Sequence, residues 1–457
     1  MPDAWEKLLP PNDPKREFIL QGVKDGFHIC DSVDINKIVF RDNYASATKP
    51  HLRPFVEKQI LTELEENRYI ITSHPATITS AIGAIPKKNS HNVRLIHDCS
   101  KPVGYALNDY ATNNLFRYQN IQDAVKFISP GSYFAKLDLA NAYRSVKTHP
   151  SNRHATGLHW TFNGDYYPTF MVDTRLPFGA RRSPEVFNEL TQAVCCIMRQ
   201  FGFPSVIAYL DDFLIIGETK SHCQTIMLFL IKLLRFLGFA INYNKVHGPC
   251  QRIVFLGILL DANHLTLGLP QDRIEDLKHC LYQVQKCKKI TKRELMSLAG
   301  KLNWACQVIY GGRFHLRRIL DRIHSLHLPS HRTRVTQEMH KDIEWWLQYI
   351  SVFNGITPMV DTRSTTSLAI DACSVAAGAV YQDNFVYTPW CLWPGTANMH
   401  INYQETLALE PAVAKWAPFW SNQTVYVHSD NKAAVSIINK GSCRDPMVME
   451  SLRRVFL

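Results

Sequence analysis

Residues 205–216 read SVIAYLDDFLII, two apolar runs that meet at Asp211 and Asp212. Each run has the length and composition of a buried strand, so the segment predicts a strand, an acidic turn and a second strand. Two-residue hairpin turns usually carry Asn-Gly or Asp-Gly, whereas here two carboxylates are forced together without a glycine. An Asp-Asp pair alone is more often ordinary turn chemistry, but repulsion between carboxylates at a strand tip favours a bound cation.

A third carboxylate, Asp138, ends another apolar strand, which is expected over residues 133–139. Magnesium prefers octahedral oxygen ligands, and two ions about 4 Å apart are best bridged by aspartates from different strands. In such a site one ion lowers the pKa of a hydroxyl nucleophile while the other holds a triphosphate. We therefore expect Asp138, Asp211 and Asp212 to be catalytic and to share two ions, Mg²⁺ or Mn²⁺.

The length and charge of the chain narrow the class of protein. Its 457 residues exceed what one hydrophobic core usually serves, so two or three domains are expected. Apolar residues make up 46% and charged residues 20%, which is ordinary globular composition. The formal charge of +11 favours a polyanionic partner, with nucleic acid as the leading candidate. Many basic proteins bind no nucleic acid, however, so charge alone does not decide.

Cysteine usage and hydropathy indicate the compartment. The twelve cysteines form no C-x-x-C unit, which favours a reduced, intracellular protein in the cytoplasm or the nucleus. The chain opens without a basic and apolar leader, and no window of about 18 apolar residues occurs, so we expect neither secretion nor a membrane partner. The sequence does not indicate an oligomeric state.

Periodicity predicts helices and strands around the acidic segments. Residues 54–69 are expected to form one amphipathic helix with an apolar stripe at Val56, Ile60 and Leu64, leaving Glu63 off that stripe. Short strands at 81–86 and 93–96, joined by a polar turn, predict a basic hairpin. Between residues 132 and 268, strands alternate with helices, which predicts an α/β or α+β core.

Two helices carry clear start signals. Ser183 is a natural N-cap and Pro184 suits the first helical position. Thr291 and Glu294 have the spacing of a capping box, followed by apolar residues at helical spacing. From residue 311 to 340 the chain turns rich in Arg and His and is broken by Pro329, which predicts a basic helix followed by a connector.

Beyond residue 364 a second α/β unit is expected, with strands at 367–381 and 424–428 and a helix between them. Asp371 and Asp430 lie in or just after these strands. Glu405 shares a helical stripe with apolar residues, so its carboxylate faces the sheet and needs a cation or a partner. An acidic residue near a helix start is by itself a common surface feature.

Nearly the whole chain resembles reverse transcriptases, most closely those of DIRS-type retrotransposons, with other long-terminal-repeat elements as the alternative. YLDD at 209–212 resembles their Y-x-D-D signature, and LDLANAY at 137–143 resembles their first catalytic motif. LPFGARRSPEVFN at 176–188 is similar to their dNTP-binding segment. The similarity extends to RLIHDCSKP at 94–102, FLG at 255–257, KRELMSLAGKLNWACQV at 292–308 and NKGSCRDPMVMESLRRVF at 439–456.

The resemblance implies an α+β fold: a right-hand polymerase with fingers, palm and thumb, followed by an incomplete RNase H-like domain. The domains implied are an N-terminal segment at 1–50, fingers and palm at 51–270, a thumb at 271–330, a connector at 331–365 and the RNase H-like domain at 366–457. The implied activity is addition of dNTPs to a DNA primer on an RNA template, with an RNA-DNA hybrid as product.

The resemblance also implies roles for particular residues. Asp371, Glu405 and Asp430 resemble three of the four catalytic, metal-binding carboxylates of RNase H; the fourth is not found before residue 457, so weak or absent cleavage of hybrids is expected. In the family Tyr143 stands beneath the sugar and excludes a ribose 2′-hydroxyl. The residues that the resemblance implies bind the dNTP are Lys87, Lys88, Arg94, Tyr143, Phe178, Gly179 and Lys245, and those that contact the primer are Phe255, Leu256 and Gly257.

Lys245 could act as a general acid toward the pyrophosphate leaving group. The competing hypotheses are a catalytically silent nucleic-acid-binding protein derived from a retroelement, and a nuclease or integrase that uses the later triad alone. Intact Asp138, Asp211 and Asp212 favour the polymerase.

Overall fold

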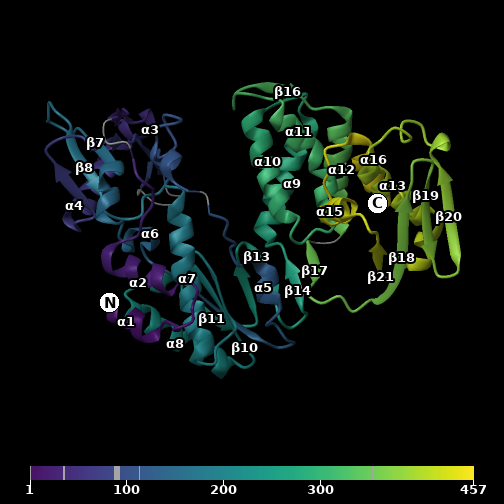
Figure 1. The fold of residues 1–457 in the computed structure, drawn as a ribbon, viewed down its shortest axis with the longest axis horizontal. Coiled ribbons are helices and arrows are strands. Elements are labelled where there is room, and N and C mark those ends of the chain that lie inside the picture. The colour runs from purple at the N-terminus through teal and green to yellow at the C-terminus, as the bar shows by residue number, and fades with distance from the viewer. Residues whose placement is uncertain (1, 34–36, 87–92, 113, 353–354, 457) are drawn as a thin grey trace. The chain divides into compact units, whose positions relative to one another are not determined.

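The computed structural model describes residues 2–33, 37–86, 93–112, 114–352 and 355–456 (Figure 1). Lys87 and Lys88, expected to contact a nucleotide, lie outside these residues. The described chain divides into two compact units, Met1–Ile253 and Val254–Leu457. Each unit has its own core, and we describe them separately.

The first unit is centred on a sheet with the strand order β11-β6-β10-β9. The sheet is antiparallel throughout, and helices α7 and α8 contribute buried apolar residues to the core beneath it. The expected strand, acidic turn and strand are therefore confirmed. The bounds are β6 Tyr133–Asp138, β9 Val206–Tyr209, β10 Asp212–Gly217, β11 His247–Cys250, α7 Arg182–Gln200 and α8 Lys220–Leu237.

A second sheet of this unit has the order β1-β3-β7-β8-β2, and the expected basic hairpin forms as β4 paired with β5. Helix α4 contributes to the same core as the hairpin. The bounds are β1 Val39–Phe40, α3 Ala45–Thr48, α4 Arg53–Glu65, β2 Tyr69–Thr72, β3 Ile78–Thr79, β4 Ile82–Pro86, β5 Val93–His97, α5 Ile121–Val125, α6 Ala142–Ser145, β7 Gly157–Trp160 and β8 Thr169–Asp173.

Three details of this unit differ from the sequence expectations. Helix α4 ends at Glu65, and Tyr69 already begins a strand. Glu63 is buried rather than on a solvent face, because it lies seven residues after Val56 and so returns to the same side of the helix. Ser183 is not the N-cap of α7: the helix begins at Arg182, and the buried Ser183 hydroxyl donates to the carbonyl of Pro177 at 3.0 Å.

The N-terminal helices α1, Pro2–Leu8, and α2, Arg16–Asp25, belong to the core of the first unit. The indole N–H of buried Trp5 donates to the carbonyl of Leu237 at 3.2 Å, at the end of α8. The N-terminal segment thus belongs to the core beneath the β11-β6-β10-β9 sheet.

The second unit begins with short strands and helices. Strands β12, β13, β14 and β17 form one sheet, and β15 pairs with β16. The capping box is confirmed, since the Thr291 side chain accepts from the Glu294 N–H at 3.2 Å while the Glu294 carboxylate accepts from the Thr291 N–H at 2.8 Å. The bounds are β12 Arg252–Phe255, β13 Ile258–Asp261, β14 Thr266–Gly268, α9 Gln271–Lys286, β15 Lys289–Thr291, α10 Lys292–Ala305, α11 Arg317–His324, β16 Arg332–Arg334, α12 Gln337–Val352 and β17 Ile356–Pro358.

The end of the second unit is the expected α/β unit, a sheet with the order β20-β19-β18-β21. Strands β18 and β21 are parallel, and the connection between β20 and β21 carries α13 and α14. The apolar faces of the sheet and of α13 and α14 form one core with α16. The bounds are β18 Ser364–Ala372, β19 Ala376–Tyr381, β20 Asn384–Pro389, α13 Ile401–Leu407, α14 Leu409–Trp416, β21 Gln423–His428, α15 Lys432–Lys440 and α16 Pro446–Val455.

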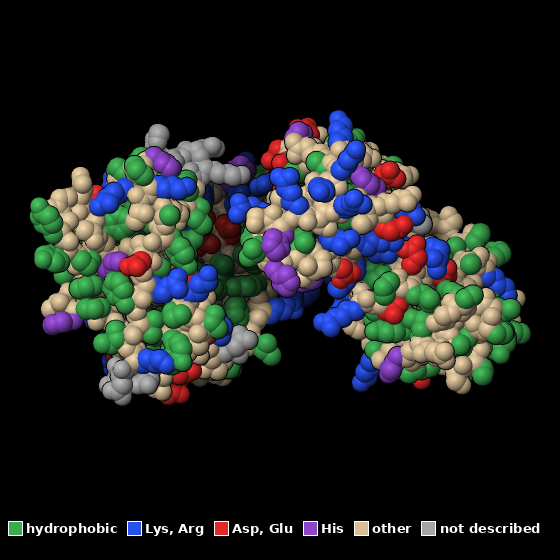
Figure 2. Space-filling model, turned by 90° about the horizontal axis from the view of Figure 1, so that it is seen from above, with side chains coloured by type: hydrophobic (Ala, Val, Ile, Leu, Met, Phe, Trp, Pro, Cys, Tyr) green, Lys and Arg blue, Asp and Glu red, His purple; other side chains and the backbone are tan. Residues whose placement is uncertain are grey.

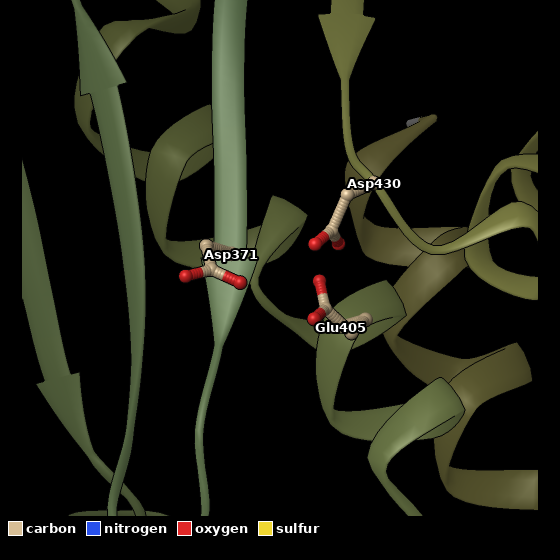
Figure 3. A group of neighbouring side chains, drawn as sticks. All are labelled: Asp371, Glu405 and Asp430. Carbon is tan, nitrogen blue, oxygen red and sulfur yellow. The ribbon is translucent and has the colours of Figure 1, made fainter.

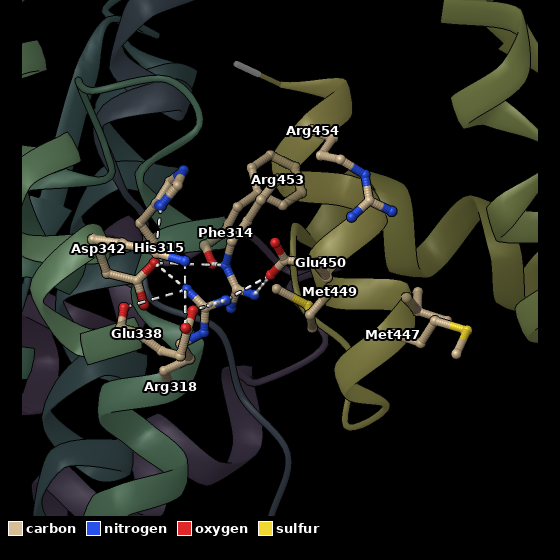
Figure 4. Close-up of polar contacts among 12 residues, drawn as sticks. Phe314, His315, Arg318, Glu338, Asp342, Met447, Met449, Glu450, Arg453 and Arg454 are labelled. Carbon is tan, nitrogen blue, oxygen red and sulfur yellow. Dashed lines mark hydrogen bonds and ion pairs between the residues drawn. The ribbon is translucent and has the colours of Figure 1, made fainter. Parts of the chain in front are cut away.

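A buried polar network ties α12 to α16 within the second unit (Figure 4). Asp342, on α12, accepts from His315 at 3.0 Å and from Arg318 at 2.9 Å. Arg453, on α16, lies 3.6 Å from Asp342 and 3.3 Å from Glu450. Buried charges are tolerated when they are paired in this way.

All twelve cysteines lie in the described residues and are free. Figure 2 shows Lys and Arg side chains over both units on the face that it presents. In the described part of the chain, no helix has the length and apolarity needed to cross a bilayer.

Candidate active site

The turn between β9 and β10 carries the acidic pair. Leu210 has a left-handed φ of 52°, which costs a residue with a side chain about 1–2 kcal/mol and lets the chain reverse between the two strands. The carbonyl of Asp211 accepts from the Leu139 N–H at 3.0 Å, which fixes the turn against the end of β6. The backbone strain is thus located at the acidic pair.

Asp138 and Asp212 are direct cross-strand partners in the pairing of β6 with β10. Such partners have Cβ atoms about 4.5–5.5 Å apart on the same face of a sheet. Asp138 also accepts from Lys245 Nζ at 2.7 Å and from Asn242 Nδ2 at 3.3 Å. The strands therefore place Asp138 beside the acidic turn, and the ammonium of Lys245 neutralises the Asp138 carboxylate.

The electrostatics of the pair agree with a cation site. Burial raises the pKa of Asp212 to about 6, and the negative charges of Asp211 and Asp138 add to the shift. Burial also raises the pKa of Asp211. The hydrogen bond to Asp138 raises the pKa of Lys245 despite partial burial. Carboxylates that repel one another in a partly buried site are the arrangement that divalent cations stabilise.

Aromatic side chains line the site beside these carboxylates. The rings of Tyr143 and Phe178 lie 5.1 Å apart, and the Arg94 guanidinium lies over Phe178 at 5.6 Å. Arg94 is exposed on the hairpin strand β5, so its charge faces solvent. Gly179 has φ of +129°, and a Cβ there would meet the His97 carbonyl oxygen at 2.0 Å, so glycine is required. The structure thus brings together Arg94, Tyr143, Phe178 and Gly179, four of the residues expected to bind the nucleotide.

The residues expected to contact the primer are the last residue of β12, Phe255, and the tight turn that follows it, Leu256 and Gly257. The Phe255 side chain is buried, with 2% exposed, while Leu256 and Gly257 have left-handed φ values of 49° and 83°. A Cβ on Gly257 would meet Trp304 Nε1 at 2.8 Å. Leu256, Gly257 and Trp304 border a cavity of about 530 Å³, so the turn rather than the Phe255 side chain is accessible.

The second group of carboxylates gathers as expected in the second unit (Figure 3). Asp371 lies near the end of β18, Asp430 follows β21, and Glu405 lies on α13. One ligand oxygen from each lies within 4.8 Å of the others. Within the described residues it is this triad that meets the distance requirement of a three-ligand metal group, rather than Asp138, Asp211 and Asp212.

Glu405 is the buried member of this group, with 4% of its surface exposed. Burial raises its pKa to about 7, and the nearby charges of Asp371 and Asp430 contribute. In the described part of the chain, its Oε2 atom has no hydrogen-bond partner. A buried oxygen without a donor, beside two further carboxylates, fits a divalent cation because oxygen is the ligand that Mg²⁺ and Mn²⁺ prefer.

Several residues near the first site were missed by sequence reasoning. Arg144, next to Tyr143, is buried against Glu63 and Asp173, and Asn108 donates to the Gly179 carbonyl at 3.0 Å. Charged residues within apolar elements were the available signal: Asp173 ends the strand TFMVD, and Glu63 has the spacing of a buried helix face.

Part of the chain matches a known protein family. Residues 85–260 match the family described as reverse transcriptase (RNA-dependent DNA polymerase). Residues 85–260 are therefore similar to reverse transcriptases. The matched segment includes Asp138, Asp211 and Asp212 and ends just after the turn at Leu256 and Gly257.

Viral polymerase proteins are similar in sequence over longer stretches. Protein P of hepatitis B virus genotype A1 is 23% identical over 299 residues, which cover 53% of this chain and 34% of that protein. The genome polyprotein of petunia vein clearing virus is 22% identical over 355 residues, which cover 73% of this chain and 14% of the polyprotein. The matched region thus spans about a third or less of these relatives.

Solved structures of similar fold include the foamy viral protease-reverse transcriptase. In complex with double-stranded DNA it aligns with a TM-score of 0.58 and 14% identity over 99% of this chain and 79% of that chain. In complex with an RNA/DNA hybrid it aligns with a TM-score of 0.57 and 15% identity, covering 99% and 61%. The likeness confirms the mixed helix and sheet polymerase fold expected from the sequence.

Proposed function

We propose that this chain is an RNA-directed DNA polymerase that adds dNTPs to a primer 3′-hydroxyl by two-metal phosphoryl transfer. The cross-strand pairing of Asp138 with Asp212, within the segment that matches reverse transcriptases, carries this proposal. Asp211 completes the acidic turn. These three aspartates would hold two ions, Mg²⁺ or Mn²⁺, which when bound would activate the hydroxyl and neutralise the triphosphate.

The chain's own residues would orient the reactants. Tyr143 and Phe178, whose rings are tilted by 36°, form an aromatic wall against which the sugar and base of a dNTP would pack. Arg94, which is exposed beside that wall, would bind the phosphates of the dNTP, as would Lys87 and Lys88. Lys245, held at 2.7 Å from Asp138, is placed to donate a proton to the leaving pyrophosphate. Leu256 and Gly257, at the turn after β12, would contact the primer.

We propose an RNase H-like role for the second unit, with Asp371, Glu405 and Asp430 as ligands for divalent cations. The support is the buried, unpartnered Glu405 oxygen facing two other carboxylates. The domain bounds proposed from the sequence remain fingers and palm at 51–270, thumb at 271–330, connector at 331–365 and RNase H-like domain at 366–457.

Nucleic acids are the proposed partners: an RNA template, a DNA primer and their hybrid. The formal charge of +11 supports this, as do structural neighbours solved with double-stranded DNA and with an RNA/DNA hybrid. We propose a retrotransposon origin, of DIRS type, on the sequence motifs alone, and a place in the cytoplasm or the nucleus.

Primer extension on an RNA template tests the proposed polymerase. The purified chain should extend a DNA primer with dNTPs in Mg²⁺, and Asp211→Asn should abolish extension while the chain still binds the primer-template. Extension by Asp211→Asn would contradict the proposed role of Asp211 in the site. No extension by the parent chain would contradict the polymerase proposal and favour a silent nucleic-acid-binding protein.

A further inference from the structure

A buried ion cluster lies behind the candidate nucleotide site of the first unit. Arg144 donates to the Glu63 carboxylate through Nε at 3.0 Å and Nη2 at 2.8 Å, and to Asp173 through Nη1 at 2.7 Å. The exposed fractions are 8% for Arg144, 4% for Glu63 and 0% for Asp173. The two carboxylates therefore bind the guanidinium from two sides, and all three side chains are almost fully excluded from solvent.

A buried cluster of charges stabilises a fold less efficiently than apolar packing does. Removing three charges from water costs several kcal/mol per ion, and well-packed apolar residues often stabilise a protein equally well. What the planar guanidinium adds is direction, because its five donors hold a fixed geometry. The cluster thus constrains where α6, α4 and β8 stand relative to one another.

Arg144 directly follows Tyr143 on the one-turn helix α6. Successive helical side chains diverge by about 100°, so fixing Arg144 against Glu63 and Asp173 fixes the direction in which Tyr143 points. Arg144 Nη1 also lies 3.5 Å from the carbonyl of Leu176, in the segment that leads to Phe178.

The cluster reaches the other side of the aromatic wall through His97. Asp173 lies 3.9 Å from His97 Nε2, and the backbone N–H of His97 donates to the Phe178 carbonyl at 2.9 Å. Tyr143 is next to Arg144 in the sequence, and the Phe178 backbone is hydrogen-bonded to His97, which lies beside Asp173. The cluster therefore constrains both rings of the wall.

We infer that Arg144 is a positioning residue for sugar selection: bridging Glu63 and Asp173, it holds Tyr143 against Phe178 and thereby sets the discrimination between dNTPs and ribonucleotides. This inference rests on the proposed polymerase function. Arg144 is buried and would touch neither substrate nor metal, so it acts only through the ring of Tyr143.

The test uses the full chain with Arg144→Lys, which keeps one positive charge but lacks the forked donors. Steady-state extension with dNTP and with the matching ribonucleotide gives kcat and KM for each. We expect KM for the dNTP to rise about fivefold or more, kcat to stay within about twofold, and the dNTP preference to fall about tenfold, as expected for losing a directional contact.

Arg453→Lys is the matched control, because Arg453 is also buried, with 5% exposed, and paired with acids, but lies in the second unit. It should lower the melting temperature comparably and leave the dNTP preference unchanged. Should Arg144→Lys fail to fold, Arg144→Met with Glu63→Gln and Asp173→Asn removes all three charges together and should show the same loss of preference.

The outcomes separate the two proposals. If the parent chain extends a primer but the folded Arg144 variants keep the parental dNTP preference, the inference is wrong and the polymerase proposal stands. An equal loss of preference in Arg453→Lys would also overturn it, because general destabilisation would then explain the effect. No extension by the parent chain would overturn both.

Discussion

Asp212 faces Asp138 directly across strands β6 and β10, and its pKa is raised to about 6 by burial and by the charges of Asp211 and Asp138. A carboxyl whose pKa is higher in the folded state binds its proton more tightly there. Its contribution to stability is therefore present at low pH and is lost as the pH rises from 3.8 to about 6. The carboxylate at pH 7 opposes folding unless a cation is bound.

Asp212→Asn should consequently stabilise the metal-free protein. We expect the free energy of unfolding at pH 7 in EDTA to rise by about 2 kcal/mol, with the gain vanishing near pH 4. Urea unfolding at both pH values measures this. The exposed Asp165→Asn is the control and should change nothing. A loss of stability in Asp212→Asn at pH 7 would contradict the assignment of a repulsive acidic site.

The role proposed for Tyr143 is to exclude ribonucleotides, and its partly buried ring lies 5.1 Å from that of Phe178. Tyr143→Val removes that ring, so ribonucleotide incorporation should rise by about 10- to 100-fold relative to dNTP, the range expected for relieving one steric clash. Tyr143→Phe keeps the ring and should preserve the preference. Single-nucleotide extension with dNTP and ribonucleotide pairs distinguishes the two variants, and equal preference in both would show that the ring does not select the sugar.

Glu405 should control metal binding in the second unit. A carboxylate must lose its proton to bind a cation, and burial raises the pKa of Glu405 to about 7. Mn²⁺ affinity should therefore fall as the pH drops from 8 to 6, by up to about tenfold per pH unit below 7. Calorimetry on the Asp211→Asn background isolates this site. Glu405→Gln should abolish the binding, whereas Glu410→Gln, which loses only the ion pair with Arg454, should not.

Cleavage of RNA in hybrids should be weak. Among the described residues the structure gathers three carboxylates, Asp371, Glu405 and Asp430, whereas the RNase H site that they resemble has four. With Mg²⁺ or Mn²⁺, we expect cleavage at least tenfold slower than primer extension on the same hybrid, since three carboxylates bind and place two ions less firmly than four. Rapid cleavage that Asp430→Asn abolishes would show this prediction to be wrong.

The sequence was sufficient for features that depend on local pattern. Alternating apolar runs around Asp211 and Asp212 placed two strands and their turn, and Thr291 with Glu294 placed a helix start, because capping depends on residues three positions apart. The resemblance to RNase H also singled out Asp371, Glu405 and Asp430, and the structure brings these three carboxylates together.

What the sequence could not predict depends on partners distant in the chain. The spacing of Glu63 from Val56 could have shown that it is buried, but no local pattern shows its partner, Arg144, which lies 81 residues away. Ser183 has the side chain of an N-cap, yet its hydroxyl bonds Pro177 and the helix starts before it. Phe255 belongs to a motif expected to contact the primer, but its side chain is buried and only the following turn is accessible. In each case tertiary packing overrides a local signal.

The proposed role of Lys245 as the proton donor to pyrophosphate can be tested by mutation. Its ammonium lies 2.7 Å from Asp138 Oδ2, and that hydrogen bond raises the pKa of Lys245, so it is protonated at pH 7 and able to donate. Lys245→Met should lower kcat of primer extension by about 100-fold, the lower end of the effect of a general acid. The Mg²⁺ concentration for half-maximal rate should not rise, because a positive charge beside the aspartates is removed. Lys220→Met, at the start of α8, is the control and should extend primers at the parental rate. If Lys245→Met instead keeps its kcat and only needs more Mg²⁺, Lys245 orders Asp138 and is not the proton donor.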